Sequence, residues 1–470
     1  MNINQKIKKT LSEILAEINV ENTGDIHLEH PNDLSHGDFS TNLAMTLSKQ
    51  LGKNPREIAD EISEKLSEKN LPEIESVSVA GPGFINIALS PFFFENSLKH
   101  ILDTGMEFGN LDIAKDKKIL VEHSSPNLFK PFHIGHMMNN TVGETMARLC
   151  YVSGAQTTVI SYPSDVSLGI GKAVWQLMHY GVEKLDEYQT IGEKMKFLGK
   201  CYADGTNAMA ENPDIEPEIR TITQDIYEHR DTPAYEAYKI GRDLNLQYFI
   251  QMTARLGSVF DGYIFESEAG IEGKKLILEN TPDIYTKGEQ DVLATEGGDT
   301  LITESGDAIL GNDYTGTIIY QPSEDEEKTG LHTRVFINRD GNPTYEAKDT
   351  GLLKLKFEKY NPDLSIFVTD SEQGPYFKVV GTAAGKINPD WQEKTKHMTH
   401  GRMQFKGEKM SSRLGNTPIV SDILDSVNEA VYEKSGDRPM TDERADMISI
   451  AALKYSILRT QPGKNINFDP

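Results

Sequence analysis

The first hundred residues carry apolar positions at both helical and strand spacing. Near the N-terminus, apolar residues recur every three or four positions with lysines and glutamates between them, which predicts an amphipathic helix. These apolar positions are Ile7, Leu11, Ile14, Leu15 and Ile18. A second helical pattern runs from Thr41 to Lys69, and the run VSVAGPGFINIALS predicts a strand region broken by glycines. Together these patterns predict a small α+β unit.

From Lys118 the pattern changes to apolar runs that are each followed by a helical pattern. KILVEHS precedes a helix that begins near His133, and TTVISYPSD precedes another from Leu168. Strands that alternate with helices predict a parallel sheet with crossover helices. Residues 185–300 are more polar and predict an insertion, after which the alternation resumes at RVFINRDG and LSIFVTD. Further helical patterns run to the end of the chain.

Composition limits the cellular compartment and the binding partners that the chain can have. The 470 residues suffice for about two to four domains. A formal net charge of -24 argues against phosphate binding by the whole surface, so a nucleic acid would dock on local basic patches. Cys150 and Cys201 are too few and too far apart for a zinc knuckle or a disulfide framework, which indicates a reducing compartment. Because the N-terminus lacks a signal-peptide core and no stretch approaches membrane-spanning length, we expect a cytoplasmic protein without membrane contact.

The stretch NLFKPFHIGHMMNN, which follows the first of these strands, combines a proline, two histidines and a glycine at the start of a helix. Pro131 has a fixed φ that suits a turn into the helix. The helix N-terminus offers unpaired N–H groups that favour a phosphate. His133 and His136 add donors, and Gly135 leaves room for a ring or a sugar. The arrangement suits a nucleoside triphosphate; the alternative is two polar residues on an exposed helix start.

A second candidate element lies in GEKMSSRLGN. Lys409 and Arg413 stand on a loop flanked by Gly407 and Gly415, with Ser411 among them. Such a loop can close over phosphates and neutralise charge as pyrophosphate departs. By itself, the same stretch would more often be a solvated basic loop.

Taken together, HIGH and KMSSR in this order on an alternating α/β chain resemble the two signature motifs of class I aminoacyl-tRNA synthetases. The stretch VEHSSPNLFKPFHIGH is similar to the strand and loop of the arginyl enzymes, and HGDFSTNLAMTLSKQLGKNPREIA resembles their additional N-terminal domain. The resemblance implies a Rossmann-like parallel-sheet catalytic domain, an N-terminal α+β domain and C-terminal helices. It also implies ATP-dependent ligation of L-arginine to tRNA(Arg) through an arginyl-adenylate, with release of AMP and pyrophosphate.

The same resemblance suggests an arginine pocket. A planar, permanently charged guanidinium needs carboxylates that can make paired hydrogen bonds. Glu122 and Asp349 match the two family carboxylates that grip it, with Tyr345 alongside. Asn127 and Gln373 match the positions that hold the α-amino end. Each acid taken alone would be an ordinary surface charge.

For catalysis, the resemblance implies that His133 and His136 hold the phosphates and ribose of ATP. Ser412 stands where the second lysine of the usual signature loop would be, and Lys130 sits where a substitute cation occurs in many arginyl enzymes. The expected catalytic residues are Lys130, His133, His136, Lys409 and Arg413, and the expected ATP contacts are His133, Gly135, His136, Lys409, Met410 and Ser411. Mg²⁺ is expected to accompany ATP without protein ligands. Tyr376 stands where many relatives have histidine, so no catalytic role is assigned to it.

For tRNA, GPGFINIAL resembles the segment through which relatives hold a base of the D-loop. Phe84 could stack on that base and Asn86 could bond its edge, although a buried strand aromatic is equally expected. The predicted domains are residues 1–112, residues 113–425 with the insertion around 185–300, and residues 426–470. The resemblance implies that an anticodon-binding domain would begin where this sequence ends, and a monomer is expected. Two alternatives stay open: a HIGH-type transferase for another amino acid, and a non-catalytic or truncated tRNA-binding paralogue.

Overall fold

The computed structural model describes residues 3–20, 25–292, 310–405, 419–436, 438–461 and 463–468. The chain divides into two compact units, Met1–Asn110 and Leu111–Pro470. Across the described residues, the helices are too short or too polar to cross a bilayer.

The first unit packs helices against a small antiparallel sheet with the strand order β1-β3-β2. Its elements are α1 (Ile3–Glu17), β1 (Phe39–Thr41), α2 (Leu43–Leu51), α3 (Pro55–Glu68), β2 (Ile74–Ala80), β3 (Phe84–Leu89) and α4 (Pro91–Thr104). Four of the five apolar positions predicted for the first helix are buried, and Ile18 packs on the same core, so the predicted α+β unit is present.

The helical pattern predicted from Thr41 to Lys69 corresponds to two helices, α2 and α3, with a break between them. Gly52 ends α2 in the left-handed region with φ 65°, a conformation that glycine adopts at little cost. Asn54 then caps α3 by accepting from the N–H of Arg56, and Pro55 occupies the first position of the helix. The apolar positions of α2 and α3 keep the same helical phase across this break. The spacing of apolar residues therefore did not reveal the break.

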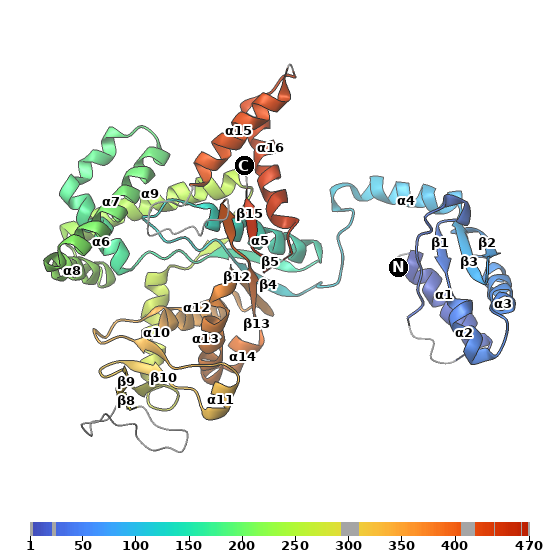
Figure 1. Ribbon diagram of the computed structural model, residues 1–470, viewed down its shortest axis with the longest axis horizontal. Helices are drawn as coiled ribbons and strands as arrows, with labels where there is room; N and C mark the ends of the chain where they lie inside the picture. The colour runs from blue at the N-terminus through green and yellow to red at the C-terminus, as the bar shows by residue number, and fades with distance from the viewer. Residues whose placement is uncertain are drawn as a thin grey trace, which may run out of the picture. The chain divides into compact units, whose positions relative to one another are not determined.

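The second unit is built on a parallel sheet with the strand order β13-β12-β4-β5-β6, in agreement with the predicted Rossmann-like class (Figure 1). Its strands are β4 (Lys118–Glu122), β5 (Gln156–Ser161), β6 (Gly262–Tyr263), β12 (Leu364–Asp370) and β13 (Thr395–His400). The strand order reverses between β4 and β12. At such a point the connections leave toward opposite faces, so a crevice opens at the carboxyl ends of the two strands.

Alternate residues of β4 face two different helices. Ile119 and Val121 share a core with Ala147 of α5 (Ile134–Val152). Leu120 packs on the other face with Leu352 of α12 (Tyr345–Tyr360). The period of two therefore directs Glu122, the last residue of the strand, to the face that α12 covers.

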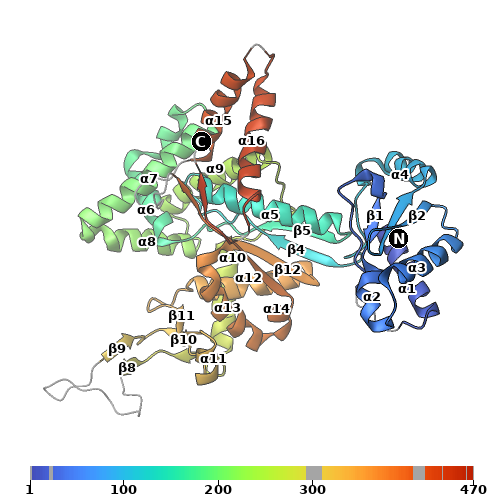
Figure 2. The same ribbon diagram turned by 45° about the vertical axis from the view of Figure 1, so that its right-hand side comes forward.

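The part of the chain predicted as a polar insertion is mainly helical. Helices α6 to α9 share a core with the C-terminal helices α15 and α16, and Figures 1 and 2 show the six gathered together. Their bounds are α6 (Leu168–Tyr180), α7 (Ile191–Glu211), α8 (Glu216–Tyr227), α9 (Pro233–Arg255), α15 (Val420–Ser435) and α16 (Asp442–Leu458). The remaining elements are α10 (Glu266–Glu279), β7 (Thr286–Lys287), β8 (Gln290–Val292), β9 (Leu310–Asp313), β10 (Ile318–Tyr320), α11 (Glu324–Lys328), β11 (Arg334–Ile337), α13 (Gly374–Ile387), α14 (Pro389–Glu393), β14 (Met403–Phe405) and β15 (Ile466–Phe468).

One predicted strand lies in a different sheet. RVFINRDG does contain a strand, β11, but it pairs antiparallel with β10, which pairs with β7. Phe336 of β11 packs on Tyr285 and Tyr320 in a core of its own. Apolar spacing identifies a strand but carries no information about its partner, so the expectation that the parallel sheet resumes there was wrong.

Candidate active site

A cavity of about 1040 Å³ opens at the carboxyl ends of β4 and β12, where the strand order reverses. The loop after β4, the first turn of α5, and residues of α12 and α13 form its walls. Eight of the predicted site residues line it: Glu122, Asn127, His133, Gly135, His136, Tyr345, Asp349 and Gln373. Residues far apart in the sequence therefore meet where the topology predicts a ligand.

Three of the remaining predicted residues, Lys130, Phe84 and Asn86, lie outside this cavity. Lys130 does not line the cavity, and its Nζ lies 4.6 Å from the ring centroid of Tyr202 in α7. Phe84 and Asn86 belong to the first unit. The loop residues Lys409, Met410, Ser411 and Arg413 lie outside the described residues, as does Ser412.

His133 and His136 form a stacked pair at the start of α5, with ring centroids 3.7 Å apart. The Nδ1 atom of His133 accepts from the N–H of Gly135 at 3.1 Å, and the Nδ1 atom of His136 accepts from the N–H of His133 at 3.3 Å. A Cβ at position 135 would lie 3.0 Å from the His133 ring, so glycine permits this close approach. Since each Nδ1 is an acceptor, a neutral ring carries its proton on Nε2.

Burial, followed by the charge of Lys130, lowers the pKa of His133 to about 4. Burial also holds the pKa of His136 well below its usual range, with His133 and Lys130 acting in the same direction. Both rings are therefore neutral at physiological pH, and each can donate one N–H from Nε2. Of the neutral or cationic forms that the sequence left open, the structure favours the neutral one.

Glu122 already has a cationic neighbour. The Nζ atom of Lys356 in α12 lies 2.5 Å from Glu122 Oε2, and the two side chains are only 2% and 8% exposed. The contact is an ion pair without the geometry of a directed hydrogen bond. Two buried opposite charges at this distance compensate each other, so Glu122 does not present a full negative charge to a ligand.

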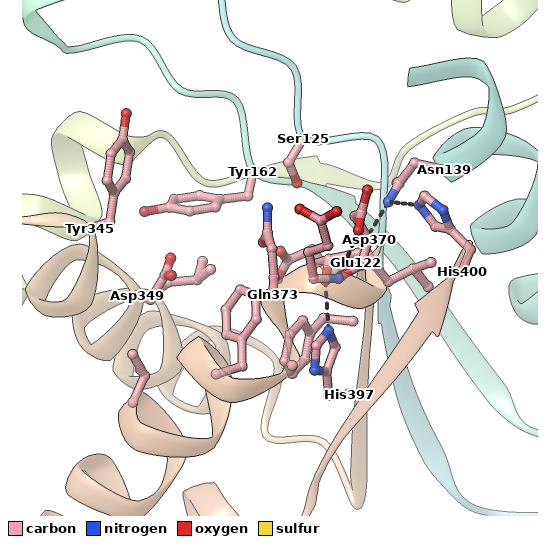
Figure 3. A pocket seen from close by; sticks show the side chains of 18 of the residues that line it. Glu122, Ser125, Asn139, Tyr162, Tyr345, Asp349, Asp370, Gln373, His397 and His400 are labelled. Atoms are coloured by element: carbon pink, nitrogen blue, oxygen red, sulfur yellow. Dashed lines mark hydrogen bonds between the residues drawn. The ribbon is translucent and has the colours of Figure 1, made fainter. Parts of the chain in front are cut away.

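Asp349 has no such cation. Its Oδ2 atom accepts from the hydroxyl of Tyr376 at 2.5 Å. Burial raises the pKa of Asp349 to about 7; the Tyr376 hydrogen bond opposes that shift, and the charge of Glu122 adds to it. Figure 3 shows Asp349 at one end of the cavity, near Tyr345 and Tyr162.

The other carboxylates in the cavity wall are paired. Glu266 lies 2.5 Å from Lys348 Nζ, and Arg402 contacts both Asp370 and Glu372. Asp349 is thus the one carboxylate in the described wall for which the structure shows no ion pair. One more positive charge would complete this end of the cavity.

A buried tyrosine adds an unpaired polar group at the same end. The hydroxyl of Tyr162 lines the cavity and has no hydrogen-bond partner within the described part of the chain. Burial and the nearby charge of Asp349 raise its pKa well above the usual range, so the hydroxyl stays protonated. A neutral O–H in this position can donate to or accept from a ligand.

Asn139 ties the other end of the cavity together. Its Oδ1 accepts from the N–H of Ser124 at 2.6 Å, and its Nδ2 donates to the carbonyl of Val368 at 2.7 Å and lies 3.3 Å from His400 Nε2 (Figure 3). One side chain of α5 therefore bridges the segments that follow or end β4, β12 and β13. The bridge fixes the position of α5, and with it the histidine pair, relative to the sheet.

Sequence reasoning missed four residues of this site: Lys356, Tyr376, Tyr162 and Asn139. Lys356 had a readable signal, because it follows Asp349 by seven positions and so shares its helix face. Tyr376 was noted only as a departure from the family pattern. Tyr162 and Asn139 carry no comparable signal in the sequence.

In the first unit, Asn86 is 6% exposed, and its Oδ1 accepts from the hydroxyl of Ser40 at 2.8 Å. Phe84 is half-buried at the start of β3. Contact of Asn86 with an RNA base would require its side chain to become accessible. No group of three or more histidine, cysteine or acidic side chains that could hold a metal is found among the described residues of either unit.

Comparison with known proteins gives consistent matches along the chain. The family described as arginyl tRNA synthetase N terminal domain matches residues 1–89, and that described as tRNA synthetases class I (R), catalytic domain, matches residues 97–469. An arginine–tRNA ligase of Clostridium perfringens is 25% identical over 98% of this chain and 76% of its own length. One of Thermococcus sibiricus is 28% identical over 92% of this chain and 62% of its own length.

Solved structures agree at the level of the fold. The arginyl-tRNA synthetase of Thermus thermophilus matches with a TM-score of 0.65 at 20% identity, covering 99% of this chain and 76% of that one. That of Plasmodium falciparum matches with a TM-score of 0.59 at 18% identity and the same coverage. At these identities the likeness concerns the arrangement of elements and not the residues of the site.

Proposed function

The chain belongs to the class I arginyl-tRNA synthetases, and on that premise we propose how its residues carry out the reaction. The reaction ligates L-arginine to tRNA through an arginyl-adenylate made from ATP. Neither alternative left open by the sequence, a transferase for another amino acid or a non-catalytic paralogue, is favoured by the family matches.

The observation that carries the proposal is the unpaired carboxylate of Asp349. Lys356 and Lys348 balance the charges of Glu122 and Glu266, which leaves one negative charge without a partner at this end of the cavity. A guanidinium supplies one permanent positive charge and several N–H donors. The side chain of arginine therefore completes both the charge and the hydrogen bonding of Asp349.

Other residues would complete the arginine pocket. Tyr345 and Tyr162 lie near Asp349 (Figure 3) and would flank the guanidinium. Glu122 would act as a second hydrogen-bond acceptor for the guanidinium, although Lys356 already compensates its negative charge. Asn127 and Gln373, which line the same cavity, would hold the α-amino end.

For ATP, the histidine pair would donate from Nε2 to the phosphates and ribose, because both Nδ1 atoms are occupied by backbone N–H groups. Gly135, whose N–H donates to His133 Nδ1, would leave room for a ring or the ribose, and the partial positive charge at the N-terminus of α5 would favour the phosphates. Lys409 and Arg413, with Met410 and Ser411 beside them, would counter the charge of the departing pyrophosphate. Lys130 would leave the Tyr202 ring to supply a further cation.

In the first step, a carboxylate oxygen of arginine attacks the α-phosphorus of ATP, and the bond to the bridging oxygen of pyrophosphate breaks. In the second step, a hydroxyl of the terminal tRNA ribose attacks the arginyl carbonyl, and AMP leaves. Positioning and charge stabilisation account for catalysis, since no covalent intermediate with the protein is needed. Mg²⁺ would arrive with the ATP phosphates, since it retains much of its water and usually binds through substrate phosphates.

Three further parts of the proposal concern the contact with tRNA, the oligomeric state and the cellular location. Phe84 and Asn86 would contact the tRNA D-loop, which requires Asn86 to exchange its bond to Ser40 for a base. The chain would work as a monomer. The buried free thiols of Cys150 and Cys201 suit a reducing compartment, which supports a cytoplasmic location.

The test is aminoacylation of tRNA(Arg) by the purified 470-residue chain with ATP and each of the standard amino acids. Arginine should be attached to the tRNA. Lysine, the other long cationic amino acid, should be attached at least about a thousandfold less efficiently. The reason is that an ammonium cannot make the paired hydrogen bonds that a buried guanidinium site provides. Preferential charging of any other amino acid would overturn the proposal.

A further inference from the structure

The carboxylate that would receive arginine is oriented by a tyrosine on a neighbouring helix. We propose that Tyr376 is a positioning residue that favours the ionised form of Asp349 and fixes its orientation, and so sets the discrimination between arginine and its neutral analogue citrulline. This inference rests on the proposed function, and it adds a determinant of specificity outside the predicted pocket.

The contact itself joins two helices. Tyr376 lies in the first turn of α13 and Asp349 in the second turn of α12, and the hydroxyl donates to Oδ2 at 2.5 Å. Within the described part of the chain, this is the only hydrogen bond that the structure shows for the Asp349 side chain. The second oxygen, Oδ1, is therefore the atom that a ligand would meet.

Tyr376 is itself held in place from a third element. The guanidinium of Arg334 in β11 lies over its ring, 5.0 Å from the centroid. Arg334 is fixed in turn by Glu346, whose Oε1 accepts at 2.9 Å, and by His332, whose Nε2 accepts at 3.0 Å. The Tyr376 ring also meets Phe377 edge to face, with ring centroids 4.8 Å apart. These contacts leave the hydroxyl little freedom, so its donation to Asp349 is pre-organised.

The chemical consequence follows from the protonation of Asp349. A buried carboxylate without a cation tends to take up a proton, and a donor aimed at its charged form opposes this. An ionised Asp349 can only accept, which suits the N–H groups of a guanidinium. A protonated Asp349 can donate, which suits the carbonyl oxygen of the ureido group in citrulline. By favouring the ionised form, Tyr376 would favour arginine and disfavour citrulline.

The test compares Tyr376→Phe with the parent chain by calorimetric titration of arginine, citrulline and ATP. Loss of a hydrogen bond to a charged group should weaken arginine binding about tenfold to a hundredfold. The ratio of arginine to citrulline affinity should fall by at least about tenfold, and ATP affinity should stay unchanged. Tyr376→His, which keeps an N–H donor, should restore part of the ratio.

Tyr180→Phe is the matched control, because the Tyr180 hydroxyl donates to Asp204 at 2.7 Å and neither residue lines the cavity. It should leave all three affinities as in the parent. A second comparison places Tyr376→Phe in an Asp349→Asn background, where its effect on arginine binding should nearly vanish if it acts through Asp349. This second pair also separates positioning from a general loss of packing.

The outcomes distinguish the two proposals. If the parent binds no arginine, the proposed function fails, and this inference fails with it. If the parent binds arginine but Tyr376→Phe keeps both its affinity and its discrimination against citrulline, the positioning role alone is overturned. An equal effect of Tyr376→Phe in the presence and absence of the Asp349 carboxylate would overturn it as well.

Discussion

Lys356 and Glu122 form a buried ion pair across the wall of the cavity, with Nζ and Oε2 2.5 Å apart. The pair joins α12 to the end of β4, which are the two elements that also supply the predicted arginine carboxylates. It therefore fixes the geometry of the pocket and at the same time removes one of its negative charges.

Lys356→Met should destabilise the chain by about 3–5 kcal/mol, because Glu122 would be left buried without a cation. The measurement is the free energy of unfolding in urea. Combining it with Glu122→Gln should recover part of the loss, since no uncompensated charge remains.

The control for this prediction is Lys394→Met. Lys394 pairs with Asp390 at 2.6 Å, but the two side chains are 39% and 56% exposed. Such a surface pair contributes about 1 kcal/mol or less. A similar loss from both substitutions would show that burial gives the Lys356 pair no special weight.

The contrast between the expected and observed pocket shows what a single sequence can supply. The pattern around KILVEHS and the following helix predicted where the site begins, and resemblance supplied Glu122 and Asp349, both of which line the cavity. The charge balance could not be predicted, because it depends on which lysine side chain reaches which acid. Lys356 shares a helix face with Asp349, yet its partner is Glu122 on a strand more than two hundred residues earlier.

Tyr376 shows the same limit in another form. The sequence showed that tyrosine is unusual at this position. Its hydrogen bond to Asp349, however, joins two helices and residues 27 positions apart. No local spacing rule connects these residues. Likewise, the spacing in RVFINRDG identified a strand and could not identify its sheet.

Asp349→Ala should weaken arginine binding by about 3 kcal/mol, because a bound guanidinium would lose its one uncompensated carboxylate. Equilibrium titration with arginine measures this directly. Asp390→Ala removes an exposed acid and serves as the control. Unchanged arginine affinity in Asp349→Ala would exclude that residue from the pocket.

Arginine binding should depend on pH near neutrality. Asp349 has a pKa raised to about 7, chiefly by burial, and its surroundings comprise Glu122 on β4, Glu266 on α10, Lys356 on α12, Tyr376 on α13 and Tyr162 after β5. A guanidinium binds the ionised form, so the dissociation constant should rise up to about tenfold for each pH unit below 7 and level off above it. His133, with a pKa of about 4, does not titrate in this range.

The raised pKa of Asp349 also predicts how the stability of the ligand-free chain depends on pH. In the unfolded chain Asp349 ionises near its usual value of 3.8, whereas in the folded chain it holds its proton until the pH reaches about 7. The contribution of Asp349 to the free energy of unfolding is therefore greatest below pH 3.8, its pKa in the unfolded chain. It is lost as the pH rises to about 7, its pKa in the folded chain. Asp349→Asn should flatten both the binding profile and this part of the stability profile. Identical profiles for the parent and Asp349→Asn would assign the titration to another group.

The last prediction concerns Lys130, whose ammonium lies over the ring of Tyr202 and not in the cavity. If Lys130 supplies a cation only as pyrophosphate leaves, Lys130→Ala should slow adenylate formation about a hundredfold and leave ATP binding nearly unchanged. Single-turnover adenylate formation with tRNA present is the measurement. Lys200 is the matched control, because its ammonium lies 5.3 Å from the Tyr180 ring centroid, away from the cavity. Lys200→Ala should keep the parent rate. A parent-like rate in Lys130→Ala would mean that the lysine only packs on Tyr202, and that the charge of the departing pyrophosphate is countered by other cations.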